Sequence, residues 1–449
     1  MDLAIKAGSA VTMDGGRIIK DALIIIEEDK IVDVGPRREL APKYRGYEVL
    51  DASTCTVIPG LVNAHTHAAM TLLRGYADDL PLKQWLEQKI WPLEACMDGR
   101  SIYVGALLAC IESALMGVTT INTMYHYFPD YNEAKAIAEA GLRGFVGHVC
   151  FEWRREEDLK AIEDLVRRWH GSYGGRVKVT IDPHAPYTVG PEYLKELRLL
   201  TDELSSKLGD RLLWHIHLAE TEDEAFKVEE AFKVDVRGGV AVYLDRLGVL
   251  GPDVVAAHCV WLTDGDVEVL ARRGVKVVHC PVSNLKLGSG IAPVPRLLSS
   301  GVTVALGTDS ACSNNLLDLL ETVKLAALLH KGVSRDPTSI SAWTALEMAT
   351  AGGAEALGLG QTTGKIKPGM KADLVAVELR KPHLTPLYDE VSHLVYAARS
   401  LDVRHVLVDG ELIVEDGEFK RMKVEDLLVE AEKEKEKLLR RLGEKTSKR

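Results

Sequence analysis

Two histidine pairs, each with one residue between its members, stand at the ends of apolar runs. His65 and His67 follow Leu61-Val62, and His217 closes a second run that has His215 two residues before it. Side chains at i and i+2 leave a strand on the same face, so both members of a pair point in one direction. Two such imidazoles can chelate a divalent metal. A lone His-x-His pair is nevertheless weak support, because composition alone produces such pairs.

Residues of metal-ligand type also end predicted strands later in the chain. They are His184 after strand four, His217 with Glu220 at strand five, His258 at strand six, His279 at strand seven and Asp309 at strand eight. In a (β/α)8 barrel the carboxyl ends of all strands meet at one rim, where the chemistry takes place. Repeated placement at one rim favours a shared site over separate hydrogen-bonded core histidines.

Three imidazoles and one carboxylate form a donor set that suits Zn²⁺ and also admits Fe²⁺ or Mn²⁺. Such a cation lowers the pKa of a bound water molecule to about 7, which makes hydroxide available at neutral pH. Glu220 comes just past the strand that holds His217, where it can stand beside the metal as a proton donor. The structural alternative is a carboxylate that supports a helix N-terminus, since Thr221-Glu-Asp-Glu begins a helix.

An alternation of apolar strands and helical segments must position these residues. The opening strand is predicted over 57–62, entered through the Pro59-Gly60 turn. The later strands are predicted over 119–124, 144–149, 177–182, 212–218, 254–258, 276–280 and 302–307. Helical patterns fill gaps at 131–140, 192–204, 240–247 and 316–329. Eight strands with intervening helices predict an α/β fold with a (β/α)8 barrel. A doubly wound open sheet would require a glycine-rich turn where this chain has Asn63-Ala-His-Thr-His67.

Short β runs at both chain ends predict a second, smaller unit. They lie at 3–7, 22–27, 30–34, 48–51, 372–378 and 403–417, and the last run has two Asp-Gly hairpin signals. A few strands cannot bury a core alone, so we expect one β-sandwich built from both ends. Residues 421–449 predict an amphipathic helix packed on one edge, with a coiled-coil partner site as the alternative. The predicted division is 1–58 and 366–420 for the sandwich, 59–365 for the barrel and 421–449 for the helix.

Composition is that of a soluble globular protein, with 46% hydrophobic and 27% charged residues in a chain of 449. The net charge of -11 argues against a nucleic-acid partner. No apolar run approaches the roughly 20 residues that span a bilayer, and no signal-peptide core precedes the first strand. Seven scattered cysteines suit a reducing compartment. We therefore expect a cytoplasmic homo-oligomer without a membrane partner.

Taken together, these residues resemble the amidohydrolase superfamily. The resemblance is to its methylthioadenosine/S-adenosylhomocysteine deaminase group, which includes 5′-deoxyadenosine deaminases, and it covers the chain from Pro59 to about Asp373. The motifs that carry it are Pro59-Gly-Leu-Val-Asn-Ala-His-Thr-His-Ala-Ala-Met-Thr-Leu-Leu-Arg-Gly75, Trp85-Leu ahead of Pro92-Leu-Glu94, Asp182-Pro-His-Ala-Pro-Tyr187, His217-Leu-Ala-Glu-Thr221, Ala257-His-Cys-Val260, Pro281-Val-Ser-Asn-Leu-Lys-Leu-Gly288 and Gly307-Thr-Asp-Ser-Ala-Cys-Ser-Asn-Asn315. The resemblance also implies the barrel and a β-sandwich built from both termini.

The resemblance implies a ligand set for one metal, made of His65, His67, His217 and Asp309. Some relatives bridge two metals with a carboxylated lysine after strand four, where this chain has His184, so a single ion is expected.

The resemblance also implies roles in proton transfer and substrate binding. His258 would orient the attacking hydroxide, and Asp309 would accept its proton and hand it to the departing ammonia. Glu220 would protonate the ring nitrogen next to the carbon under attack. Glu94 and His184 would contact the ribose hydroxyls and the nucleoside.

Two further residues concern the substrate. Trp85 is a candidate flat wall for the heterocycle, with an ordinary core tryptophan as the alternative. Relatives that prefer S-adenosylhomocysteine have arginines near the end of strand three. Here His148 occupies the aligned substrate position, with Arg154-Arg155 a few residues on. This departure favours a small, neutral 5′ group.

The expected activity is therefore metal-dependent hydrolytic deamination of adenosine-type nucleosides with a modified 5′ position. Candidate substrates are 5′-deoxyadenosine, 5′-methylthioadenosine, S-adenosylhomocysteine and adenosine. The C6 atom of adenine is a poor electrophile, so a proton on N1 and a metal-activated hydroxide must act together. The alternative enzyme is a deaminase or chlorohydrolase of guanine or a triazine. A non-catalytic scaffold is disfavoured, because every proposed ligand and proton-transfer residue is present.

Overall fold

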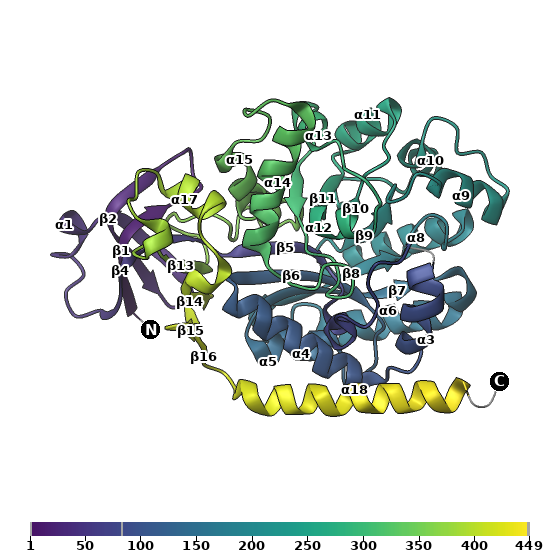
Figure 1. Cartoon of the computed structure of the whole chain (residues 1–449), viewed down its shortest axis with the longest axis horizontal. Helices are drawn as coiled ribbons and strands as arrows, with labels where there is room; N and C mark the ends of the chain where they lie inside the picture. The colour runs from purple at the N-terminus through teal and green to yellow at the C-terminus, as the bar shows by residue number, and fades with distance from the viewer. Residues whose placement is uncertain (1, 82–83, 447–449) are drawn as a thin grey trace.

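The computed structural model describes residues 2–81 and 84–446, which form a parallel barrel and a terminal sheet (Figure 1). The barrel strands are hydrogen-bonded in chain order. They are β5 (Leu61–Thr66), β6 (Val118–Tyr125), β7 (Arg143–Cys150), β8 (Val177–Pro183), β9 (Leu213–Leu218), β10 (Val254–His258), β11 (Lys276–His279) and β12 (Val304–Leu306). The predicted eight-stranded barrel is confirmed.

Helices cover the outside of the barrel, as the crossover connections of parallel strands require. They are α4 (Gly99–Leu115), α5 (Glu133–Ala140), α6 (Arg155–Trp169), α8 (Pro191–Leu208), α9 (Glu224–Phe232), α10 (Val240–Leu247), α11 (Asp264–Arg273), α12 (Pro281–Lys286), α13 (Val294–Ser299), α14 (Leu319–Ser334), α15 (Ala342–Met348) and α16 (Ala351–Ala356). The strands beneath them are buried on both faces, including their threonine, asparagine and histidine residues.

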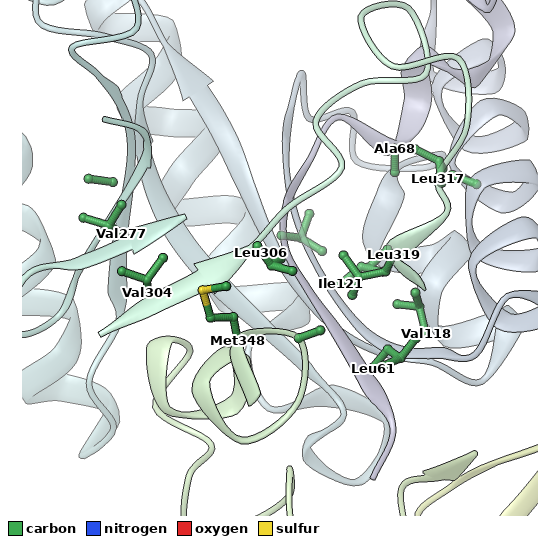
Figure 2. Packing of buried hydrophobic residues seen from close by; sticks show 14 of the residues in the cluster. Leu61, Ala68, Val118, Ile121, Val277, Val304, Leu306, Leu317, Leu319 and Met348 are labelled. Carbon is green, nitrogen blue, oxygen red and sulfur yellow. The ribbon is translucent and has the colours of Figure 1, made fainter. Parts of the chain in front are cut away.

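One large apolar cluster joins the first and last barrel strands. Figure 2 shows part of it, with Leu61, Val118 and Ile121 from β5 and β6, Leu306 from β12 and Met348 from α15. The labelled side chains are almost wholly buried. This packing joins the two ends of the barrel, although its elements are far apart in the sequence.

Polar contacts complete the closure between β5 and the end of β12. Asn63 Nδ2 donates to Thr308 Oγ1 at 2.7 Å, and the Thr308 N–H donates to Asn63 Oδ1 at 3.0 Å. The Asp309 N–H then donates to the His65 carbonyl oxygen at 3.0 Å. Gly307 passes so close that a Cβ atom there would lie 2.9 Å from His65 Cβ. These contacts place Asp309, which lies just past β12, beside His65.

Strands from both chain ends form the second unit, as predicted. The sheet order is β16-β15-β14-β13-β4-β1-β2-β3, and β1 pairs in parallel with β4. The strands are β1 (Asp2–Val11), β2 (Ile18–Glu27), β3 (Lys30–Pro36), β4 (Glu48–Pro59), β13 (Leu374–Glu378), β14 (Val403–Val408), β15 (Glu411–Glu415) and β16 (Glu418–Phe419), with α1 (Arg37–Leu40) and α17 (Glu390–Tyr396) at the edges.

The predicted opening strand of the barrel needs correction. Val57 and Ile58 belong to β4 of the terminal sheet, where they pair with β13, and β5 begins only at Leu61. The chain crosses between the two units at Gly60, where a Cβ atom would lie 2.0 Å from Thr119 Oγ1. Glycine is therefore required at the crossing. The apolar run continues from β4 into β5, so the sequence pattern does not change where one sheet ends and the other begins.

The C-terminal helix α18 (Val424–Thr446) lies along α4 (Figure 1). Leu427, Ala431 and Leu438 form its buried stripe, so the helix packs on one edge of the barrel. Residues 447–449 of the predicted helical segment lie outside the described residues. Within the described part of the chain, no helix combines the length and hydropathy needed to cross a membrane.

Candidate metal and catalytic site

A cavity opens at the carboxyl ends of the barrel strands and gathers most of the predicted site residues. Its lining includes Trp85, Glu94, His67, His184, His217, Glu220, His258 and Asp309. His65 lies beneath this surface and is fully buried. The histidines, Glu220 and Asp309 share one pocket because each lies at or just past the end of a strand, whereas Trp85 and Glu94 reach it from the segment between β5 and β6.

Four of these residues approach one another as a ligand cluster. His67 Nε2 lies 3.2 Å from His217 Nε2. Asp309 Oδ1 lies 3.4 Å from the Nε2 atoms of both His65 and His67. Ligand atoms of His65, His67 and His217 all lie within 4.8 Å of one another, and the same holds for His65, His258 and Asp309. The geometry is that of a small centre surrounded by nitrogen and oxygen donors.

The partners of the Nδ1 atoms decide which ring nitrogens face this centre with a lone pair. His67 Nδ1 lies 2.7 Å from the Met124 carbonyl oxygen, and His217 Nδ1 lies 2.7 Å from the His184 carbonyl oxygen. A carbonyl only accepts, so both Nδ1 atoms carry the hydrogen and both Nε2 atoms carry a lone pair. Two lone pairs at 3.2 Å repel unless a cation lies between them. The arrangement fits a bound metal ion.

The first histidine of the cluster also has a buried ring nitrogen that is free to bind a cation. His65 Nε2 is buried and has no hydrogen-bond partner among the described residues, while its Nδ1 lies 2.8 Å from His215 Nε2. Burial lowers the pKa of His65 and of His217 well below the usual range. Both rings are therefore neutral, which is the form that binds a metal.

One carboxylate oxygen of Asp309 faces the ligand cluster, and the other accepts hydrogen bonds from two hydroxyl groups. Oδ2 accepts hydrogen bonds from Ser283 Oγ at 2.5 Å and from Ser313 Oγ at 2.9 Å. Burial opposes the charged form, but the histidines that surround its carboxylate hold the pKa of Asp309 well below its usual range. The backbone of Asp309 is left-handed, with φ of 59°, which turns its side chain into the barrel mouth.

His258 is fixed above the cluster by an amide side chain. Its Nδ1 lies 2.9 Å from Asn284 Oδ1, and its ring stacks on His217 with centroids 5.4 Å apart. Burial lowers the pKa of His258, but the charges of Glu220 and Asp309 more than offset it, so the pKa is raised. Sequence reasoning missed Asn284, Ser283 and Ser313, because no spacing rule connects them to His258 or Asp309.

Glu220 lies on the cavity wall, and a neighbouring glutamate performs the backbone role considered for it. Glu224, in the first turn of α9, accepts hydrogen bonds from the N–H groups of Ala219 and Glu220 at 2.7 and 2.9 Å. The Glu220 side chain is half-buried at the cavity, and its loss of contact with solvent raises its pKa. A carboxyl group with a raised pKa at a cavity wall is suited to donate a proton.

A short segment between β5 and β6 forms the opposite wall. It comprises η2 (Trp85–Ile90) and α3 (Trp91–Glu94), which the sequence patterns did not predict as helical. Trp85 Nε1 donates to the Ala77 carbonyl oxygen at 2.9 Å, which orients the indole along the cavity. Burial raises the pKa of Glu94 to about 7.

His126 also lines this cavity and was missed by sequence reasoning. It follows β6, so its strand-end position was a usable signal. Its Nε2 lies 4.0 Å from Glu94 Oε1, and its Nδ1 accepts from Arg154 Nη1 at 3.1 Å. His184, on the neighbouring wall, has its Nδ1 2.8 Å from Thr188 Oγ1. Burial lowers the pKa of both histidines to about 3, so both are neutral.

Two strand-end histidines do not reach the cavity. His148 is buried behind it, with Nε2 2.9 Å from Asp158 Oδ1 and Nδ1 accepting from the Tyr127 N–H at 3.0 Å. Both nitrogens are occupied, so the predicted substrate contact of His148 is replaced by a structural one. His279 pairs with His330, their Nε2 atoms 3.3 Å apart. Alternation along a strand sends these side chains to the other face.

Comparison with known proteins places these features among enzymes. The model of the amidohydrolase family matches residues 56–413. A 5′-deoxyadenosine deaminase of Methanosarcina mazei is 45% identical over 98% of this chain and 99% of the relative. A 5-methylthioadenosine/S-adenosylhomocysteine deaminase of Syntrophobacter fumaroxidans is 45% identical over 95% and 96% of the two chains. A solved adenosine deaminase from Xanthomonas campestris with bound zinc superposes with a TM-score of 0.92 at 35% identity, covering 97% of this chain and 98% of that one.

Proposed function

The chain belongs to the amidohydrolase family, and we propose that it hydrolytically deaminates adenosine-type nucleosides at C6, releasing ammonia and the inosine analogue. The observation that carries the proposal is one cavity that joins the imidazole–carboxylate cluster to the half-buried acid Glu220. The names of relatives that match nearly the whole chain support an adenosine-type substrate.

In this proposal His65, His67, His217 and Asp309 hold one divalent metal, with Zn²⁺ favoured by the donor set and by the zinc-bound relative. When bound, the cation supplies a water molecule whose pKa is lowered to about 7. Asp309 would accept a proton from the attacking water, and its second oxygen is held by a hydrogen bond from Ser283. His258, held by Asn284, orients the attacking oxygen.

Glu220 supplies the second half of the chemistry. Its proton moves to N1 of the purine as the oxygen bonds to C6, which lets the ring accept the electron pair. Asp309 then passes its proton to the amino group, and the C6–N bond breaks to release ammonia. The remaining proton of the added hydroxyl restores Glu220 as the carbonyl forms. Removal of the Glu220 proton alone should therefore stop chemistry without preventing binding.

The nucleoside would lie between the two cavity walls. The Trp85 indole offers an apolar face to the heterocycle, and the Glu94 carboxylate can accept hydrogen bonds from both ribose hydroxyls. His184 lies between this wall and the ligand cluster, with its ring 4.9 Å from that of His217. The three residues would thus fix the C6 atom over the cluster.

A second cavity of about 500 Å³ adjoins the first through Trp91, Glu94, His126 and Phe151. Aromatic rings dominate its lining, and Arg154 stands at one side. That guanidinium already contacts Asp158 at 3.3 Å and His126 at 3.1 Å. Because this space is apolar and the Arg154 guanidinium already has partners, it suits the neutral 5′ groups of 5′-deoxyadenosine and 5′-methylthioadenosine better than the charged 5′ group of S-adenosylhomocysteine.

A substrate panel tests this function directly. We expect 5′-deoxyadenosine and 5′-methylthioadenosine to show kcat/KM about tenfold above S-adenosylhomocysteine and at least about 10³-fold above guanine or a triazine. Turnover is followed by ammonia release and by the absorbance change at the purine. A preference for guanine or a triazine would replace the proposal with the alternative aminated-heterocycle hydrolase.

Glu94→Gln tests the ribose contact and its pH dependence. Because the Glu94 pKa is about 7, the accepting carboxylate is present above that pH and is lost as the pH falls through it. Wild-type KM for 5′-deoxyadenosine should therefore rise below pH 7. Glu94→Gln should raise KM about 30-fold and flatten this rise. An unchanged profile in the variant would remove Glu94 from ribose recognition.

We further propose that the protein works in the cytoplasm, which its seven free, buried cysteines support. Assembly into a homo-oligomer stays a prediction.

A further inference from the structure

The C-terminal helix α18 is anchored along the barrel by its first half. Leu427 and Ala431 join the main apolar cluster, and Arg100 Nε, near the start of α4, donates to Glu430 Oε1 at 3.0 Å. Glu434 is almost fully buried and accepts from Ser101 Oγ at 3.2 Å. This half of α18 therefore has a fixed position on α4, whatever its second half contacts.

The second half of α18 reaches the outside of the wall that carries Glu94. Leu438 is buried in the apolar cluster that contains Trp85, Ile90 and Leu93. These are residues of η2 and α3, whose inner faces line the cavity. Figure 1 shows the end of α18 beneath α3. The helix thus packs against the back of the segment whose front would hold the nucleoside.

Two basic side chains of α18 fix the turn that directly follows Glu94. Arg441 Nη1 donates to the Cys96 carbonyl oxygen at 2.9 Å, and its Nη2 donates to Asp98 Oδ2 at 2.6 Å. Lys445 Nζ donates to the Ala95 carbonyl oxygen at 2.8 Å. Asp98 is itself the N-cap of α4. Arg441 therefore ties the end of α3 to the start of α4 on both sides of the turn.

We propose that Arg441 is a positioning residue for ribose recognition, acting with Lys445 and Leu438 through Glu94 without touching the nucleoside. The inference rests on the proposed function. Glu94 is the last residue of a helical segment in which η2 runs directly into α3. The outer side of this segment packs on Leu438, and the backbone carbonyls just past its end accept hydrogen bonds from Arg441 and Lys445. Loosening them should displace the Glu94 carboxylate while the ligand cluster, on the far side of the cavity, stays in place.

The test compares Arg441→Met with Arg440→Met on two nucleosides. Arg440 is exposed in the same turn, which makes it a matched control. The nucleosides are 5′-deoxyadenosine and its 2′,3′,5′-trideoxy analogue, which lacks the two ribose hydroxyls that would donate hydrogen bonds to Glu94. Arg441→Met should raise KM for 5′-deoxyadenosine about tenfold and leave kcat within about twofold. Values for the trideoxy analogue, the metal content and all Arg440→Met values should match the wild type.

Two further variants separate positioning from general destabilisation. Lys445→Met should raise the same KM in the same direction by a smaller factor, and Arg441→Lys should recover part of the loss. Equal kinetics for Arg441→Met and Arg440→Met would overturn the inference alone. An equal loss of kcat on both nucleosides with a lower Tm would also overturn it, because it reveals only a structural role. Absence of deamination by the wild-type enzyme would overturn the proposed function as well.

Discussion

His217→Ala is expected to lose both the bound metal and the deaminase activity. The ring supplies one of the facing Nε2 lone pairs, with its Nδ1 pinned 2.7 Å from the His184 carbonyl oxygen. Without it the donor set falls to two imidazoles and a carboxylate, and kcat/KM should fall by at least about 10³-fold. Metal content is measured on the purified variant by atomic emission, and turnover by ammonia release from 5′-deoxyadenosine.

The matched control for this variant is His383→Ala, which removes an exposed histidine remote from the barrel mouth. It should keep the metal content and kcat/KM of the wild type. A His217→Ala protein that retains one metal per chain and full turnover would remove His217 from the ligand set.

Glu220→Gln is expected to lower kcat by at least about 10²-fold while metal content and nucleoside affinity stay near those of the wild type. Glutamine keeps the size and polarity of the side chain but has no carboxylic proton to give to N1. Burial raises the pKa of the wild-type carboxyl, which favours the form that carries the proton. Stopped turnover with intact binding would therefore separate proton donation from substrate contact.

Glu222→Gln is the control for this second variant, because Glu222 is exposed two residues further on. Its kcat should be unchanged. Affinity is measured by equilibrium titration with a slowly hydrolysed nucleoside. If Glu220→Gln turned over at the wild-type kcat, another group would have to protonate the ring, and the proton-donor role would fail.

Strand-end position was the part of the site that the sequence could predict. His65, His67, His217 and Asp309 lie at or just past the ends of β5, β9 and β12, and parallel strands bring their ends to one rim. His148 shows the limit of the rule. It lies on a strand near its end, but its side chain leaves the other face and meets Asp158.

The partners that give the cluster its chemistry could not be predicted. The Nδ1 atoms of His67 and His217 form hydrogen bonds with backbone carbonyl oxygens. Every residue has a backbone carbonyl, so no residue type in the sequence identifies these partners. Ser283 and Asn284 act from a six-residue helix whose direction depends on packing. Trp85 and Glu94 were predicted as substrate contacts, but the helical form of the η2–α3 segment was not, and this segment packs on Leu438 of α18 at the other end of the chain.

We expect one metal ion between the histidines and Asp309, and anomalous diffraction at the zinc edge would locate it. Crystals of the full chain grown with stoichiometric Zn²⁺ should show one strong anomalous peak. It should lie about 2.0–2.2 Å from the Nε2 atoms of His65, His67 and His217 and from a carboxylate oxygen of Asp309. A peak bound by other residues, or none at this centre, would contradict the account.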